Sequence, residues 1–138
     1  MFTMTKITII IPVEDFDEAS KYYRDVLSFS HQDGLFFLPV ETVDVALRLM
    51  IIPEEWKINS PPRRHFQIFN YKLEKNFLSY CEKIYKKGAL IEMACSTPGG
   101  YYARISDPAG NQFEIECDNF EEDDATVDTL TMPFFFRY

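Results

Sequence analysis

Apolar and polar residues alternate along the first half of the chain in a way that predicts one strand, one helix and three further strands. Residues 6–13 are rich in β-branched side chains and are expected to form a strand. Apolar side chains return every three or four positions over residues 16–27, which is typical of a helix with one buried face. Short strands are expected next at 28–32, 35–40 and 43–52. The predicted order of the first half is therefore βαβββ.

The second half repeats this order. Residues 65–69 predict a strand and residues 73–87 an amphipathic helix, with Gly88 placed where a helix would end. Three further strands are predicted over residues 89–95, 101–106 and 112–117. A shift of 57 positions superposes the first strand and the helix of the two halves without a gap, whereas the later strands need one.

The doubled pattern predicts an α+β fold in which two tandem βαβββ modules form curved mixed sheets that enclose a cleft. Module one spans residues 5–52, a proline-containing connector spans 53–64, and module two spans 65–118. Residues 1–118 are thus expected to form a single domain that binds its ligand in the cleft. The tail, 119–138, is first acidic and then aromatic. Because its three consecutive phenylalanines would form an apolar patch in water, we expect it to dock on the domain or on the partner of a homodimer.

Composition narrows the classes of partner. The chain has 138 residues, with 14 Lys and Arg against 22 Asp and Glu and a net charge of -8. This charge disfavours binding to nucleic acid or to anionic lipid. No apolar run is long enough for a membrane helix, and the three cysteines have no CxxC spacing, which fits reduced thiols. We therefore expect a cytoplasmic protein whose partner is a small molecule.

Two segments of the chain resemble the vicinal oxygen chelate superfamily, which contains glyoxalases, bleomycin resistance proteins and extradiol dioxygenases. Residues 13–27, VEDFDEASKYYRDVL, are similar to the first helix of that family. Residues 107–114, DPAGNQFE, are similar to its turn before the last strand. The resemblance covers about residues 5–118 and implies the same paired modules and cleft.

Many members of this superfamily hold one divalent metal, which the resemblance here implies would be zinc, nickel, manganese or iron. It places His65 and Glu114 at two of the four ligand positions, and Glu114 is also the catalytic candidate, as a ligand or a base. Thr8 and Arg48 stand at the other two. A threonine hydroxyl is a poor ligand, and a guanidinium cannot ligate at all. Another carboxylate could complete the site if the register differs: Glu41, Glu92 or Glu116.

Catalytic metal sites usually have three protein ligands, so this set favours a metal-free pocket over an intact metal centre. In such a pocket Thr8 and Arg48 would contact the ligand, and Arg48 could pair with Glu114. Aromatic candidates for ligand contact are Phe36, Trp56 and Tyr102, with Trp56 in the connector able either to cover the cleft or to plug it.

Two functions follow from these residues. The favoured one is a binding protein for an aromatic or cationic small molecule, such as an antibiotic, with an incomplete metal site. The alternative is a metal-dependent enzyme of the lactoylglutathione lyase, fosfomycin thiol-transferase or extradiol dioxygenase type. The sequence does not identify the ligand or substrate.

Overall fold

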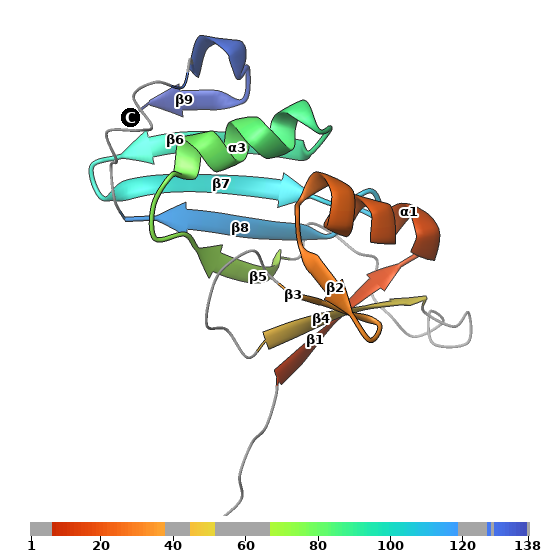
Figure 1. Cartoon of the computed structure of the whole chain (residues 1–138). Helices are drawn as coiled ribbons and strands as arrows, with labels where there is room; N and C mark the ends of the chain where they lie inside the picture. The colour runs from red at the N-terminus through yellow and green to blue at the C-terminus, as the bar shows by residue number, and fades with distance from the viewer. Residues whose placement is uncertain (1–6, 38–44, 52–66, 119–126, 128, 138) are drawn as a thin grey trace, which may run out of the picture. The chain divides into compact units, whose positions relative to one another are not determined.

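The chain divides into two compact units, Met1–Arg64 and His65–Tyr138, and each contains its own mixed sheet (Figure 1). The computed structural model describes residues 7–37, 45–51, 67–118, 127 and 129–137. The connector 53–64 and the acidic start of the tail lie outside these residues. None of the helices in the described part of the chain has the length and apolar character to span a bilayer.

The first unit confirms the predicted βαβββ order. Its elements are β1 (Ile7–Val13), α1 (Phe16–Lys21), the π-helical turn η1 (Tyr22–Val26), β2 (Ser30–Gln32), β3 (Leu35–Phe37) and β4 (Val45–Ile51). The strands lie in the order β1-β4-β3-β2. β1 and β4 are parallel, and the remaining pairs are antiparallel.

Local side-chain chemistry explains where the helix of the first unit starts and what it covers. Asp15 caps α1, because its carboxylate accepts a hydrogen bond from the backbone N–H of Glu18 at 3.1 Å. Tyr23 and Phe29 are buried, and their rings lie 5.6 Å apart. This apolar side packs on the sheet, as the periodicity predicted.

The second unit repeats the order and adds one strand. Its elements are β5 (Gln67–Lys72), α3 (Phe77–Lys86), β6 (Leu90–Thr97), β7 (Gly100–Ser106), β8 (Gln112–Cys117), the 3₁₀ turn η3 (Thr129–Thr131) and β9 (Phe135–Arg137). The strands lie in the order β5-β8-β7-β6-β9, with β5 parallel to β8 and β9 parallel to β6. The α+β class with two βαβββ modules is therefore confirmed.

The start of the second helix differs from the prediction. The helix was expected from residue 73, but α3 begins at Phe77, after Asn76 with a φ of 61°. A left-handed residue cannot continue an α-helix, so the preceding residues stay outside it. The two helices begin at Phe16 and Phe77, which are further apart than the 57-residue shift implies.

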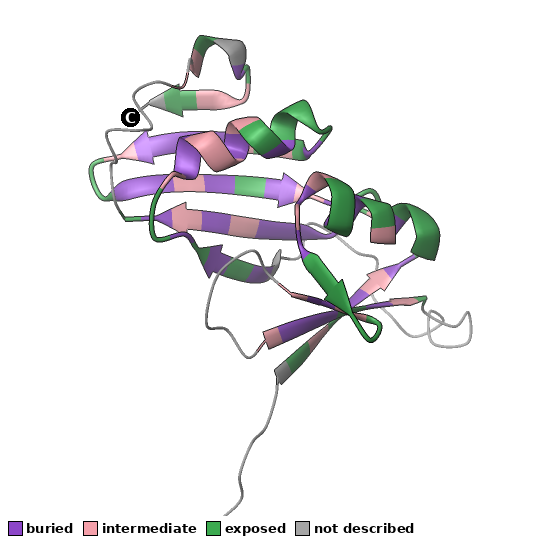
Figure 2. Cartoon of the chain, viewed as in Figure 1, coloured by how far each residue is buried: buried purple, intermediate pink, exposed green. Residues whose placement is uncertain are grey.

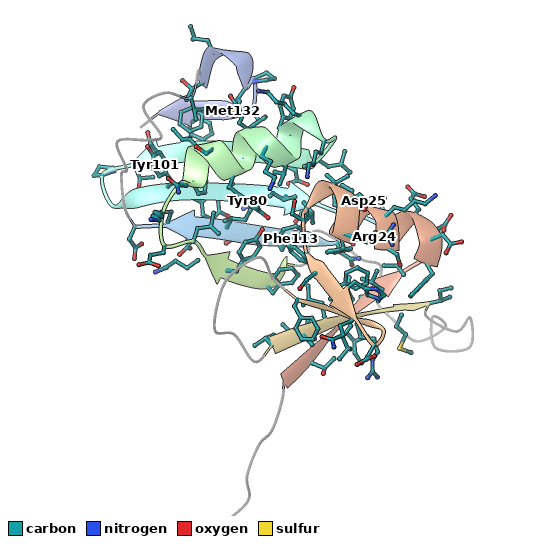
Figure 3. The ribbon with its side chains drawn as sticks, viewed as in Figure 1. Arg24, Asp25, Tyr80, Tyr101, Phe113 and Met132 are labelled. Carbon is teal, nitrogen blue, oxygen red and sulfur yellow. The ribbon has the colours of Figure 1, made fainter. Side chains whose placement is uncertain are left out.

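Helix α3 covers one face of the second sheet. The ring of Phe77 stacks on Tyr101 with 4.9 Å between ring centroids, and the hydroxyls of Tyr80 and Tyr71 lie 2.8 Å apart. Tyr80 and Tyr101 are labelled in Figure 3. Figure 2 shows buried residues alternating with more exposed ones along β7 and β8. Because successive side chains of a strand point to opposite faces, Tyr102 lies on the other side of the sheet from Tyr101. We call this other side, away from α3, the far face.

The end of the tail docks on its own unit. β9 pairs with β6, Met132 is 2% exposed, and the ring of Phe134 lies 4.9 Å from that of Tyr85. Much of the aromatic segment thus has a partner within the chain. The homodimer stays a prediction, and it loses the support that an undocked tail would have given it.

Candidate functional site

A tight turn places β8 in the second sheet. The buried carboxylate of Asp107 accepts hydrogen bonds from the backbone N–H groups of Ala109 and Asn111, both at 2.9 Å. It also accepts one from the side-chain amide of Asn111 at 2.8 Å. These bonds close the turn, so the strand that follows enters the sheet in a fixed register. That register decides which side chains lie beside Glu114.

Glu114 lies on the far face between residues of two neighbouring strands. It pairs with Arg104 of β7 and with Asn70 of β5. The hydroxyl of Tyr102 donates a hydrogen bond to the Oε1 atom of Glu114. Arg104 donates from Nη2 to the Tyr102 hydroxyl at 3.3 Å, and the same Nη2 lies 3.8 Å from Oε1 of Glu114. The Glu114 carboxylate is therefore already held by a phenol and a guanidinium.

Burial and hydrogen bonding shift the pKa values of two members of this group, Tyr102 and Arg104. The side chain of Glu114 is 15% exposed and that of Arg104 is 44% exposed. Burial, and then the hydrogen bond to Glu114, raise the pKa of Tyr102 above its ordinary value. The hydrogen bond to Tyr102 is the main cause that raises the pKa of Arg104. Near neutral pH the Tyr102 phenol is therefore protonated and the Arg104 guanidinium is charged.

The two other carboxylates of the far face also have hydrogen-bond partners. Glu92 lies where β6 shifts register against β7, and it accepts two bonds from the amide of Gln112, at 2.7 and 2.9 Å, and one from the Ser106 hydroxyl. Glu116 accepts a bond from the Asn70 amide at 3.2 Å. Polar side chains thus form three hydrogen-bonded groups on the far face, and that of Glu114 lies between the other two along β8.

An apolar border adjoins these polar groups. Cys95 of β6 pairs with Tyr102, and Phe136 of β9 pairs with Cys95, so the three side chains form a row on the far face. Phe136 is 39% exposed, whereas Cys95 is 3% exposed. Burial raises the pKa of the Cys95 thiol. The row offers an exposed aromatic ring and a half-buried one on either side of a buried thiol.

The structure brings together two of the residues singled out from sequence in this unit, Tyr102 and Glu114. His65 and Trp56 lie outside the described residues. The residue of β5 that pairs with Glu114 is Asn70, which the sequence did not suggest. Arg104 was also missed, although its spacing of two from Tyr102 within a predicted strand was a usable signal.

Thr8 and Arg48 share one face of the first sheet. Thr8 pairs with Ala46 and Ile10 pairs with Arg48, so alternation puts Thr8, Ile10 and Arg48 on the same side. Both predicted residues are exposed. Pairing of Arg48 with Glu114, and a cleft shared by the modules, stay predictions.

Phe36 requires a correction. It was expected to contact a ligand, but its side chain is 1% exposed and its ring lies 6.1 Å from that of the buried Tyr23. The β3–β4 register pairs it with Leu47, which is also fully buried. The ring therefore belongs to the core of the first unit, because alternation along β3 points it towards the helix side.

The described residues do not fit a catalytic metal. Within the ranges that the structure describes, no three His, Cys, Asp or Glu side chains lie close enough together to hold an ion. Glu114 has a guanidinium within 3.8 Å, which cannot ligate and whose charge opposes a cation. Zinc, nickel, manganese and iron sites of this kind normally need three protein ligands.

Comparison with known proteins identifies the family. The model of the Glyoxalase/Bleomycin resistance protein/Dioxygenase superfamily matches residues 6–115, so the chain belongs to this superfamily. The resemblance drawn from residues 13–27 and 107–114 is confirmed. No curated protein matches the chain closely enough to be counted as a relative.

Solved structures share the fold at low sequence identity. UcmS2 is 17% identical with a TM-score of 0.66, covering 83% of this chain and 98% of that one. TnmS3, an antibiotic binding protein from Streptomyces sp. CB03234, is 20% identical with a TM-score of 0.65, covering 86% and 99%. Lactoylglutathione lyase from Agrobacterium tumefaciens is 23% identical with a TM-score of 0.55, covering 80% and 91%. At these identities the likeness shows the fold alone, which binding proteins and enzymes share.

Proposed function

We propose that this protein binds an aromatic or cationic small molecule, such as an antibiotic, without a metal ion. The observation that carries the proposal is the state of Glu114. Its carboxylate accepts the Tyr102 hydroxyl and lies beside Arg104, so the residue that would ligate a metal has other partners. A ligand would then be recognised by side chains of the far face directly.

The chemistry of the far face supports this class of ligand. Its three carboxylates, Glu92, Glu114 and Glu116, outnumber its two cations, Arg104 and Lys72. Lys72 also forms an ion pair with Asp118, so the excess of negative charge favours a cationic ligand. The rings of Tyr102 and Phe136 supply aromatic surfaces that can stack on a planar ligand or lie against a cation. TnmS3, which shares this fold, is an antibiotic binding protein.

Isothermal titration with a panel of aromatic compounds, bleomycin among them, tests the proposal. Naphthylmethylamine, naphthylmethanol and naphthoate form a matched series that differs mainly in charge. We expect at least one compound to bind in the presence of EDTA, and the amine to bind more tightly than the carboxylate. No binding by any member of the panel would overturn the proposal.

A matched pair of variants locates the site. Phe136→Ala removes a ring that is 39% exposed on the far face, and Phe16→Ala removes one that is 43% exposed on α1 of the other unit. We expect only Phe136→Ala to weaken binding, by about fivefold, since one aromatic contact contributes on the order of 1 kcal/mol. Equal effects of the two variants would place the site elsewhere.

Metal analysis separates this function from the enzymatic alternative. Protein purified without chelators should contain no stoichiometric zinc, nickel, manganese or iron. One equivalent of metal that is lost in His65→Ala would overturn the proposal in favour of a metal-dependent lyase, thiol transferase or dioxygenase. A homodimer and a cytoplasmic location stay predictions.

A further inference from the structure

Arg104 occupies a position that the sequence left unassigned. It lies directly across from Glu114 in the β7–β8 ladder, and its Nη2 atom is 3.8 Å from the Glu114 carboxylate. Opposite charges at paired positions of antiparallel strands attract each other. The position of the guanidinium therefore follows from strand register and needs no contact from the other unit.

We infer that Arg104, together with Tyr102, takes the place of a divalent cation at Glu114 and so makes this site metal-free. The guanidinium supplies positive charge, and the phenol supplies a hydrogen-bond donor to the same carboxylate oxygen. The inference rests on the proposed metal-independent function and names the residues responsible for it.

The burial of Glu114 explains why such a partner is needed. Its side chain is only 15% exposed, and a carboxylate that loses water requires a counter-charge or donors in its place. Metal ions meet this requirement in many sites, and a guanidinium with a hydroxyl meets it without one. Asn70, the partner of Glu114 on the β5 side, directs its amide to Glu116 at 3.2 Å.

The same arrangement disfavours a metal ion. An ion ligated by Glu114 would stand within a few ångströms of the guanidinium, and like charges at that distance repel strongly where water is partly excluded. Arg104 also donates to Tyr102 at 3.3 Å, which holds it beside the carboxylate. Arginine is effectively always protonated in proteins, so raising the pH to mildly alkaline values does not remove the repulsion.

Nickel titration of the full chain tests the inference. Arg104→Leu removes the charge, and we expect it to bind Ni²⁺ at least about tenfold more tightly than the wild type, because the local repulsion is gone. The gain should disappear in the double variant Arg104→Leu/Glu114→Gln. A gain that survives loss of Glu114, or no gain at all, would overturn the inference.

Arg24→Leu is the matched control. Arg24 lies on η1 of the first unit, where its Nε atom is 2.9 Å from Asp25, and its side chain is 51% exposed (Figure 3). This variant changes the net charge by the same amount far from the proposed site in sequence, and its Ni²⁺ affinity should equal that of the wild type. An equal gain in both variants would show a general charge effect and overturn the inference.

Two further measurements keep the outcomes distinct. Circular dichroism checks folding, and Arg104→Gln, which keeps hydrogen-bonding capacity without charge, replaces Arg104→Leu if that variant unfolds. Stoichiometric metal in the wild type would overturn the proposed function and this inference together. A metal-free wild type with no gain in Arg104→Leu or Arg104→Gln would overturn the inference alone.

Discussion

Cys95 lies between two aromatic residues of the far face, yet its side chain is 3% exposed. Burial removes water from the thiolate and so raises the pKa of Cys95 above its ordinary value of 9.0. At mildly alkaline pH the folded protein therefore binds this proton more strongly than the unfolded chain does. The contribution to stability is full below the ordinary pKa and is lost as pH rises through the higher folded value.

Thiol labelling checks this prediction. We expect Cys95 to react with a disulfide reagent far more slowly in the native protein than in urea. Raising the pH from about 7 to about 9 should increase the rate at native Cys95 by a smaller factor than the rate of a free thiol. Mass spectrometry assigns the site among Cys81, Cys95 and Cys117, all of which are buried. If native Cys95 reacted at the rate of a free thiol, the burial of its side chain between Tyr102 and Phe136 would be contradicted.

Phe36 and Tyr102 show how far the role of a single residue can be predicted from the sequence. Both are aromatic residues of short predicted strands, and both were candidate ligand contacts. The structure buries Phe36 in the core, while the Tyr102 hydroxyl reaches Glu114. Alternation along a strand shows which residues share a face, but which face becomes the core depends on the helix that packs on it.

At the scale of an element, the turn between β6 and β7 depends on Gly100 more than on its neighbour Gly99. Gly100 has a φ of 140°, and a Cβ atom there would overlap the carbonyl oxygen of Cys117. A Cβ at Gly99 would meet only the hydroxyl oxygen of Thr97, at 3.9 Å. The close approach of β8 makes Gly100 necessary.

Alanine substitutions at the two glycines test this difference. We expect Gly100→Ala to lower the free energy of unfolding by about 2 kcal/mol or more, because backbone strain and overlap add. Gly99→Ala should change it by less than about 0.5 kcal/mol. Urea unfolding followed by circular dichroism measures both, and equal stabilities would contradict the close approach.

At the scale of the whole molecule, the C-terminal segment belongs to the second unit. β9 extends the sheet beside β6, and Met132 is 2% exposed, whereas Leu130, two residues earlier, is 93% exposed. The apolar contact of Met132 therefore holds a segment that follows the predicted modules in the sequence. The sequence left open whether this contact would be made within the chain or with a partner.

A pair of tail variants measures that contact. We expect Met132→Ala to lower the free energy of unfolding by about 2 to 4 kcal/mol, as for a buried methionine that leaves a cavity. Leu130→Ala should stay within about 0.5 kcal/mol of the wild type. If urea unfolding showed that Met132→Ala changed the free energy of unfolding as little as Leu130→Ala, the tail would not be part of the folded unit.

The sequence by itself determined the order of elements within the two modules and the turn that delivers Glu114, and the resemblance of residues 13–27 and 107–114 indicated the family. The order and the turn follow from local periodicity, capping and turn chemistry, which neighbouring residues carry. The contacts of Glu114 required the tertiary structure, because strand register decides that Arg104 and Asn70, far apart in sequence, lie on either side of it. The same holds for Phe136, which reaches the far face only because β9 pairs with β6.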